Sequence, residues 1–94
     1  MYIFSANAKT RNDIEGFPAD SEVPFIVYIS FKDQLGAEHL CKLYLMREGF
    51  YDISIENRKL ISEKYLSNKK LVAHDRPLRE AIKSGYFIQL FESH

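Results

Sequence analysis

The sequence predicts a small α+β fold in one domain, and two observations support this prediction. First, β-prone runs are interleaved with two stretches whose apolar residues recur at helical spacing. Second, one joint occurs twice. Residues 45–56, LMREGFYDISIE, and residues 81–92, AIKSGYFIQLFE, both pass from a helix-forming run through one glycine into an aromatic, β-prone run. With 94 residues, the chain has room for one hydrophobic core.

The N-terminal third predicts two strands joined by a long loop. Residues 2–9 alternate with a period of two, which predicts a strand with one solvated face at a sheet edge. Residues 10–24 combine turn-forming and acidic residues, and predict a surface loop. Residues 23–31 are apolar on both faces, as expected for a central strand covered by helices.

The first helix is predicted over residues 34–48, with Asp33 as its N-cap and Gly49 as its end. One stripe of this helix collects the apolar residues Ala37, Leu40, Cys41, Tyr44 and Leu45. Residues 50–56 then alternate, which predicts a strand. A tight turn at Asn57 and Arg58 is expected to return residues 59–61 beside it as a short hairpin partner.

The C-terminal third predicts a second long helix and a last strand. Within residues 62–74, a short helical turn is expected to begin at Ser62 and to end at Asn68. Asp75 then caps a helix that has Pro77 in its first turn and Gly85 at its end. Its apolar stripe is Leu78, Ala81 and Ile82. The apolar run that closes the chain predicts a buried strand.

From residue 24 the predicted order is strand, helix, strand, strand, helix, strand. This βαββαβ order is that of a ferredoxin-like two-layer sandwich, preceded here by an extra N-terminal strand. The two main helices are expected on one sheet face, which leaves the other face available for binding or dimerisation.

Composition favours a protein partner over nucleic acid. The net charge is zero, but residues 1–38 hold three basic and six acidic residues, and the remainder is correspondingly basic. Such a dipolar surface suits self-association, whereas nucleic-acid binding usually comes with a domain-wide basic excess. No run is apolar enough to span a membrane. The single cysteine excludes an internal disulfide, and we expect a cytoplasmic protein.

Few residues suggest chemistry. Glu38, His39 and Cys41 are close in sequence, but the helical stripe turns Cys41 inward as a core residue. His74 beside Asp75 is interpreted as a solvated histidine next to a capping residue. Since catalytic, phosphate-binding and metal-spaced motifs are missing, we expect neither enzymatic activity nor a cofactor or metal.

A basic segment, residues 68–85, raises a nucleic-acid alternative. Aromatic residues on an open ferredoxin-like sheet can stack on single-stranded RNA. The RNA-recognition signature is missing from the predicted third strand, so this hypothesis ranks below protein binding. Its candidate contacts are Lys69, Lys70, Arg76, Arg79 and Lys83.

A binding module is the class that we favour, acting as a homodimer. Tyr2 and Phe4 lie on the strand expected at the sheet edge, where only Lys9 would discourage pairing. We therefore expect self-association through Tyr2 and Phe4. A further alternative is small-molecule sensing between the two protomers, for which no residue marks a pocket.

The segment AEHLCKLYLMREGFYDISIE, residues 37–56, resembles joints in small uncharacterised bacterial α+β proteins, including proteins from mobile gene cassettes. The resemblance covers about a fifth of the chain. It implies a bacterial cytosolic origin and brings no site residues with it.

Overall fold

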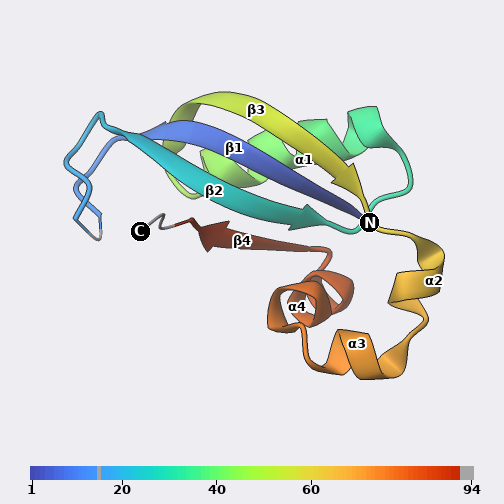
Figure 1. Cartoon of the computed structure of the whole chain (residues 1–94). Helices are drawn as coiled ribbons and strands as arrows, with labels where there is room; N and C mark the ends of the chain where they lie inside the picture. Colours follow the sequence, from blue (N-terminus) through green and yellow to red (C-terminus); the bar gives the residue numbers. More distant parts are fainter. Residues whose placement is uncertain (15, 92–94) are drawn as a thin grey trace.

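The computed structural model describes residues 1–14 and 16–91, which form a curved sheet and helices (Figure 1). The strands are β1 (Tyr2–Thr10), β2 (Glu22–Ile29), β3 (Phe50–Leu60) and β4 (Tyr86–Leu90). The helices are α1 (Gln34–Arg47), α2 (Glu63–Leu66), α3 (Lys69–Ala73) and α4 (Arg76–Ser84). The strand order is β3-β1-β2-β4, and every neighbouring pair is antiparallel. The predicted α+β class is confirmed.

The ferredoxin-like arrangement with an extra strand is not confirmed. The hairpin predicted at Asn57 and Arg58 is wrong, because β3 continues through both residues. Residues on both sides of this point pair with β1, with two register shifts along the ladder. The dipeptide Asn-Arg is weak turn chemistry, and β1 supplies backbone partners as far as Leu60. The strand therefore has no reason to turn.

The prediction that residues 2–9 form an edge strand is also wrong, because β1 pairs with β2 on one side and β3 on the other. The alternation itself is real. The residues facing α1 are the buried Phe4, Ala6 and Ala8, and those facing away are Ser5, Asn7 and Lys9. A period of two reports which face is solvated, and says nothing about the position of the strand within the sheet.

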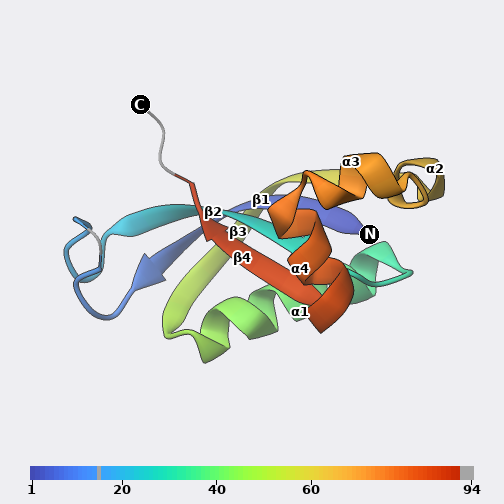
Figure 2. The ribbon, with the colours of Figure 1, turned by 90° about the horizontal axis from the view of Figure 1, so that it is seen from below.

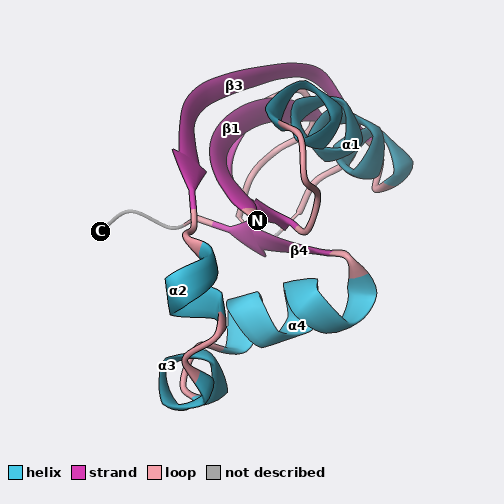
Figure 3. Cartoon of the chain, turned by 90° about the vertical axis from the view of Figure 1, so that its right-hand side faces the viewer, coloured by secondary structure: helices cyan, strands magenta, loops and turns pink. Residues whose placement is uncertain are grey.

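The main core lies between α1 and the concave face of the sheet, where β3 and β1 curve around the helix (Figure 3). Asp33 begins α1 by accepting a hydrogen bond from the Gly36 amide at 2.8 Å, as predicted. The stripe is confirmed, since Ala37, Cys41 and Leu45 are fully buried. Both faces of β2 are at least partly buried, which matches its predicted central place.

The two longer helices pack on opposite faces of the sheet, so their predicted placement on one face is wrong (Figure 3). On the side away from α1, Tyr28 meets Phe87 edge to face, with ring centroids 6.4 Å apart. Leu78 and Ala81 of α4 are fully buried but lie outside the core cluster of α1. A second, smaller apolar layer therefore lies under α4. Residues 62–75 reach across to the other face before α4 begins.

Short polar caps organise this crossing segment. Ser62 caps α2 as predicted, whereas Asn68 begins α3 by accepting hydrogen bonds from two backbone amides. Asp75 caps α4 by accepting from the Leu78 amide at 3.1 Å, as predicted. Burial, followed by the nearby Asp75 carboxylate, raises the pKa of Tyr28. The start of α4 thus lies near β2.

The repeated joint is confirmed as a local structure. Gly49 and Gly85 follow the ends of α1 and α4, with φ angles of 94° and 95° in the left-handed region. Each glycine leads directly into an edge strand, β3 or β4.

Replacing Gly49 by alanine should lower the free energy of unfolding by roughly 1–2 kcal/mol. A Cβ at this position meets no atom within 4 Å, so the cost is backbone strain alone. Urea unfolding followed by circular dichroism measures the loss. The Gly49→Asn variant should lose less, because asparagine tolerates the left-handed region better. An alanine variant as stable as the wild type would contradict this prediction.

Candidate functional site

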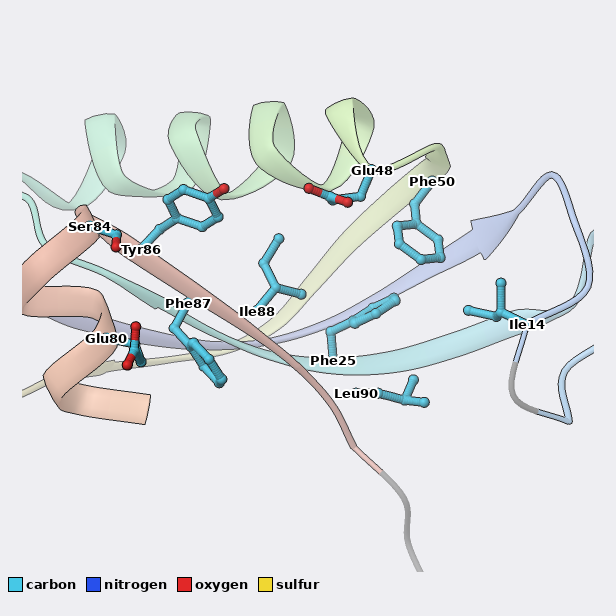
Figure 4. Close-up of a pocket in the computed structure, with 10 residues that line it drawn as sticks. All are labelled: Ile14, Phe25, Glu48, Phe50, Glu80, Ser84, Tyr86, Phe87, Ile88 and Leu90. Atoms are coloured by element: carbon cyan, nitrogen blue, oxygen red, sulfur yellow. The ribbon is translucent and has the colours of Figure 1, made fainter. Parts of the chain in front are cut away.

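A groove of about 620 Å³ follows the outer edge of β4 (Figure 4). One wall contains Glu48 and Phe50, which follow α1, together with Ile14 from the loop between β1 and β2. The other wall contains Glu80 and Ser84 of α4. The remaining lining residues are Phe25 of β2 and Tyr86, Phe87, Ile88 and Leu90 of β4. We call this the β4 groove.

Aromatic contacts shape the α1 side of the groove. Phe50 meets Phe25 at a centroid distance of 4.7 Å and an interplanar angle of 64°. Tyr86 stacks on Tyr44 of α1 at 3.9 Å. Phe50 and Tyr86 are the first residues after the two joint glycines. The repeated joint therefore places one aromatic ring at each of two positions along the same groove.

Three residues of β4 have backbone amides and carbonyls that face away from the sheet. The Ser30 amide donates to the Gly85 carbonyl at 2.9 Å, and the Phe91 amide donates to the Pro24 carbonyl at 3.0 Å. Because an antiparallel ladder alternates, the hydrogen-bonding groups of Phe87 and Gln89 in β4, like those of the flanking Gly85 and Phe91, face β2. The amides and carbonyls of Tyr86, Ile88 and Leu90 face away from the sheet.

No strand within residues 1–14 and 16–91 pairs with this outer edge. Seen from below, β4 crosses the molecule with α4 on one side and α1 on the other (Figure 2). An edge strand with unpaired amides and carbonyls is a template for another strand. The outer edge of β4 can therefore accept one.

The opposite edge of the sheet, β3, is protected. Exposed charged side chains lie along it, namely Asp52, Glu56, Arg58 and Lys59. Asp52 pairs with Lys9 at 3.3 Å, and Arg58 pairs with Glu38 at 2.6 Å. Charges and ladder irregularities discourage strand pairing. By contrast, residues 86–91 carry no charged side chain.

The residues predicted for self-association do not lie at a surface edge. Phe4 has no exposed surface, and Tyr2 stacks near it with ring centroids 6.1 Å apart. Both belong to a strand paired on both sides. A second copy cannot reach Phe4 without opening the core.

The predicted nucleic-acid contacts lie on the helices outside the groove. The residues are Lys69 and Lys70 on α3 and Arg76, Arg79 and Lys83 on α4, and all are exposed. None of them lines the β4 groove. Tyr28 and Phe87 pack against each other beside α4 instead of forming an open stacking face. RNA binding through residues 68–85 stays a prediction.

The candidates for chemistry do not converge. Cys41 is a core residue, as predicted, and burial raises the pKa of its thiol to about 12. Glu38 pairs with Arg58, whereas His39 is exposed. His74 is exposed beside the capping Asp75. Within the described residues, His, Cys, Asp and Glu side chains form no cluster of three suited to a metal ion.

None of the helices in the described residues has the length and apolar character needed to cross a membrane.

Sequence reasoning missed the groove because it placed the last strand in the interior. The apolar run of residues 86–91 has the composition of a buried strand, and periodicity cannot distinguish that from an edge beside an apolar groove. The sequence signal for the groove was the repeated joint. The residues that directly follow its two glycines, Phe50 and Tyr86, both line the groove.

Comparison with known protein families, curated proteins and solved structures found no match. The resemblance of residues 37–56 to bacterial gene-cassette proteins therefore stays a prediction.

Proposed function

We propose that this chain is a small, non-catalytic interaction module that binds an extended segment of a protein partner as a fifth strand beside β4. The outward-facing amides and carbonyls of Tyr86, Ile88 and Leu90 carry this proposal. In strand addition, main-chain hydrogen bonds give affinity, and pockets for alternate side chains give specificity. The β4 groove supplies such a pocket along the same edge. A cytoplasmic location is part of this proposal.

A second copy of the chain is one source of such a strand, and a homodimer is what the sequence led us to expect. The alternation of β4 sets the geometry. Antiparallel pairing around a twofold axis would place Ile88 opposite the same residue of the second copy, and Tyr86 opposite Leu90. The result would be a continuous sheet through two copies.

Hydrogen exchange measured by NMR tests strand addition at single residues. In the isolated protein the Ile88 and Leu90 amides should exchange rapidly, whereas those of Phe87 and Gln89 should be protected by β2. Peptides selected from a displayed random library against this protein should protect Ile88 and Leu90. The proposal is wrong if neither such peptides nor a higher protein concentration protects these two amides.

A pair of variants isolates the backbone contribution. The Ile88→Pro variant removes an outward amide and leaves the ladder with β2 intact, while Ile88→Ala keeps the amide and removes most of the side chain. Selected peptides should bind the proline variant at least about tenfold more weakly than the alanine variant. Equal affinities would contradict strand addition. Thermal unfolding checks that both variants fold, and the exchange pattern of the wild type remains decisive if one does not.

A further inference from the structure

We infer that the strand bound by the β4 groove carries basic side chains and comes from another protein, not from a second copy of this chain. The inference rests on the proposed strand addition and specifies the chemistry of the partner.

The charged residues that line the β4 groove are both acidic. Glu48 projects from the α1 side and Glu80 from the α4 side, so the two carboxylates lie on opposite walls (Figure 4). Within residues 1–14 and 16–91, neither carboxylate has a salt-bridge partner. A bound strand therefore passes between two carboxylates that it can neutralise.

Both walls also include the C-terminal end of a helix. Glu48 is the C-cap of α1, and Ser84 is the last residue of α4. The C-terminal end of a helix carries a partial negative charge of about half an electron, which favours cations nearby. Arg47 and Lys83 lie in these last turns but do not line the groove, and Arg47 is placed over the Tyr44 ring at 6.0 Å. The groove thus combines two carboxylates with two negative helix ends.

The residues of the two walls indicate which side chains the partner strand should carry. On the α1 side, apolar residues predominate, including Phe25, Phe50 and Ile88. Side chains of the partner that point to this side are therefore apolar at most positions. A lysine or arginine has an apolar stem that can pack along such a surface while its charged end reaches Glu48 or Glu80. An extended segment of alternating apolar and basic residues satisfies both requirements.

A second copy does not meet this pattern. Residues 86–91, YFIQLF, contain no basic side chain. Pairing of two copies would also bring a second Glu48 and a second Glu80 to the same seam. Covering a half-buried carboxylate such as Glu80 without a cation costs free energy through desolvation, and like charges add to that cost.

Two synthetic peptides test the inference. The first alternates valine with threonine and lysine, in the order Thr-Val-Lys-Val-Thr-Val-Lys-Val-Thr, and the second has glutamate in place of each lysine. Fluorescence anisotropy should show the lysine peptide binding at least about tenfold more tightly at low salt, with a smaller difference at high salt. When the valines face the α1 side, both lysines point to the α4 side, so Glu80→Gln should weaken binding by about three- to tenfold and Glu48→Gln by less. Glu63→Gln is the matched control, because Glu63 of α2 is exposed and does not line the β4 groove.

Hydrogen exchange separates failure of the inference from failure of the proposed function. If both peptides protect the Ile88 and Leu90 amides equally, or if protection rises only with protein concentration, strand addition stands and the basic partner is wrong. If these amides stay unprotected under every condition, strand addition itself is wrong. Equal effects of the two groove variants and of the Glu63 control would also overturn the assignment of the acidic walls.

Discussion

Replacing Phe4 by glutamate should unfold this domain. Phe4 has no exposed surface and belongs to the core under α1. Truncating a buried phenylalanine costs about 3–5 kcal/mol, and a carboxylate at the same place adds a desolvation penalty. A small domain has a total free energy of unfolding of roughly 5–15 kcal/mol. The variant should therefore lose most or all of its stability, as measured by far-UV circular dichroism and urea unfolding.

The matched control is Leu35→Glu. Leu35 lies on the outer face of α1 and is 77% exposed, so this change should alter the free energy of unfolding by no more than about 0.5 kcal/mol. A folded Phe4→Glu protein would show that Phe4 lies at a surface, as the sequence alone suggested.

The domain should lose stability between pH 9 and pH 12 because of one thiol. Burial is the main cause that raises the pKa of Cys41 from 9.0 to about 12. In the unfolded chain the thiol ionises near the lower value, whereas in the folded protein it keeps its proton until the higher one. Proton release therefore favours the unfolded state. The stabilisation is complete below pH 9 and declines as the pH rises, by about 2 kcal/mol at roughly pH 10.5.

Comparison with Cys41→Ala isolates this effect from the titration of lysines and tyrosines. Urea unfolding gives the free energy of unfolding of both proteins at about pH 8 and about pH 10.5. The contribution of the thiol is the loss of the wild type between these two pH values minus the loss of the alanine variant. The alanine variant should lose less stability over this range, whatever constant cost its smaller side chain brings. If both proteins lose the same amount, the Cys41 thiol does not titrate as the structure indicates.

Local structure was largely predictable, because single residues determine it. Asp33 and Asp75 each accept the capping hydrogen bond that their positions predicted. Gly49 and Gly85 adopt the left-handed conformation that ends a helix most easily when no Cβ is present. The helical stripe through Cys41 also agrees with its burial. Each of these features depends on neighbours within a few positions in the chain.

Long-range arrangement was not predictable in the same way. Whether β1 lies at an edge depends on the partners of both its sides, and its own residues encode only its two faces. In the sequence, Asn57 and Arg58 have the composition of a weak turn. In the fold, the neighbouring strand β1 supplies partners for the residues on both sides of them. The side on which α4 packs depends on the path of residues 62–75, where two short helices stand in place of the single predicted turn.

The candidate site was predictable only in part. The sequence predicts a binding module with its interaction surface at Tyr2 and Phe4. In the fold Phe4 is buried, and the strand that carries both residues is paired on both sides. It did identify the joints at Gly49 and Gly85 as equivalent structures. That both joints lie along one groove could not be predicted without the strand order of the sheet, because the two joints are far apart in the chain.

The difference between the two edges of the sheet limits the size of any assembly. A subunit with two receptive edges can add copies at both ends and grow into a filament. Within residues 1–14 and 16–91, the exposed charges of Asp52, Glu56 and Lys59 protect β3, which leaves β4 as the uncovered edge of the sheet. Under the proposed strand addition, each chain therefore offers a single edge, which one strand occupies. Each chain should therefore take up no more than one strand through the β4 groove, and copies of the chain should not add to one another at β3.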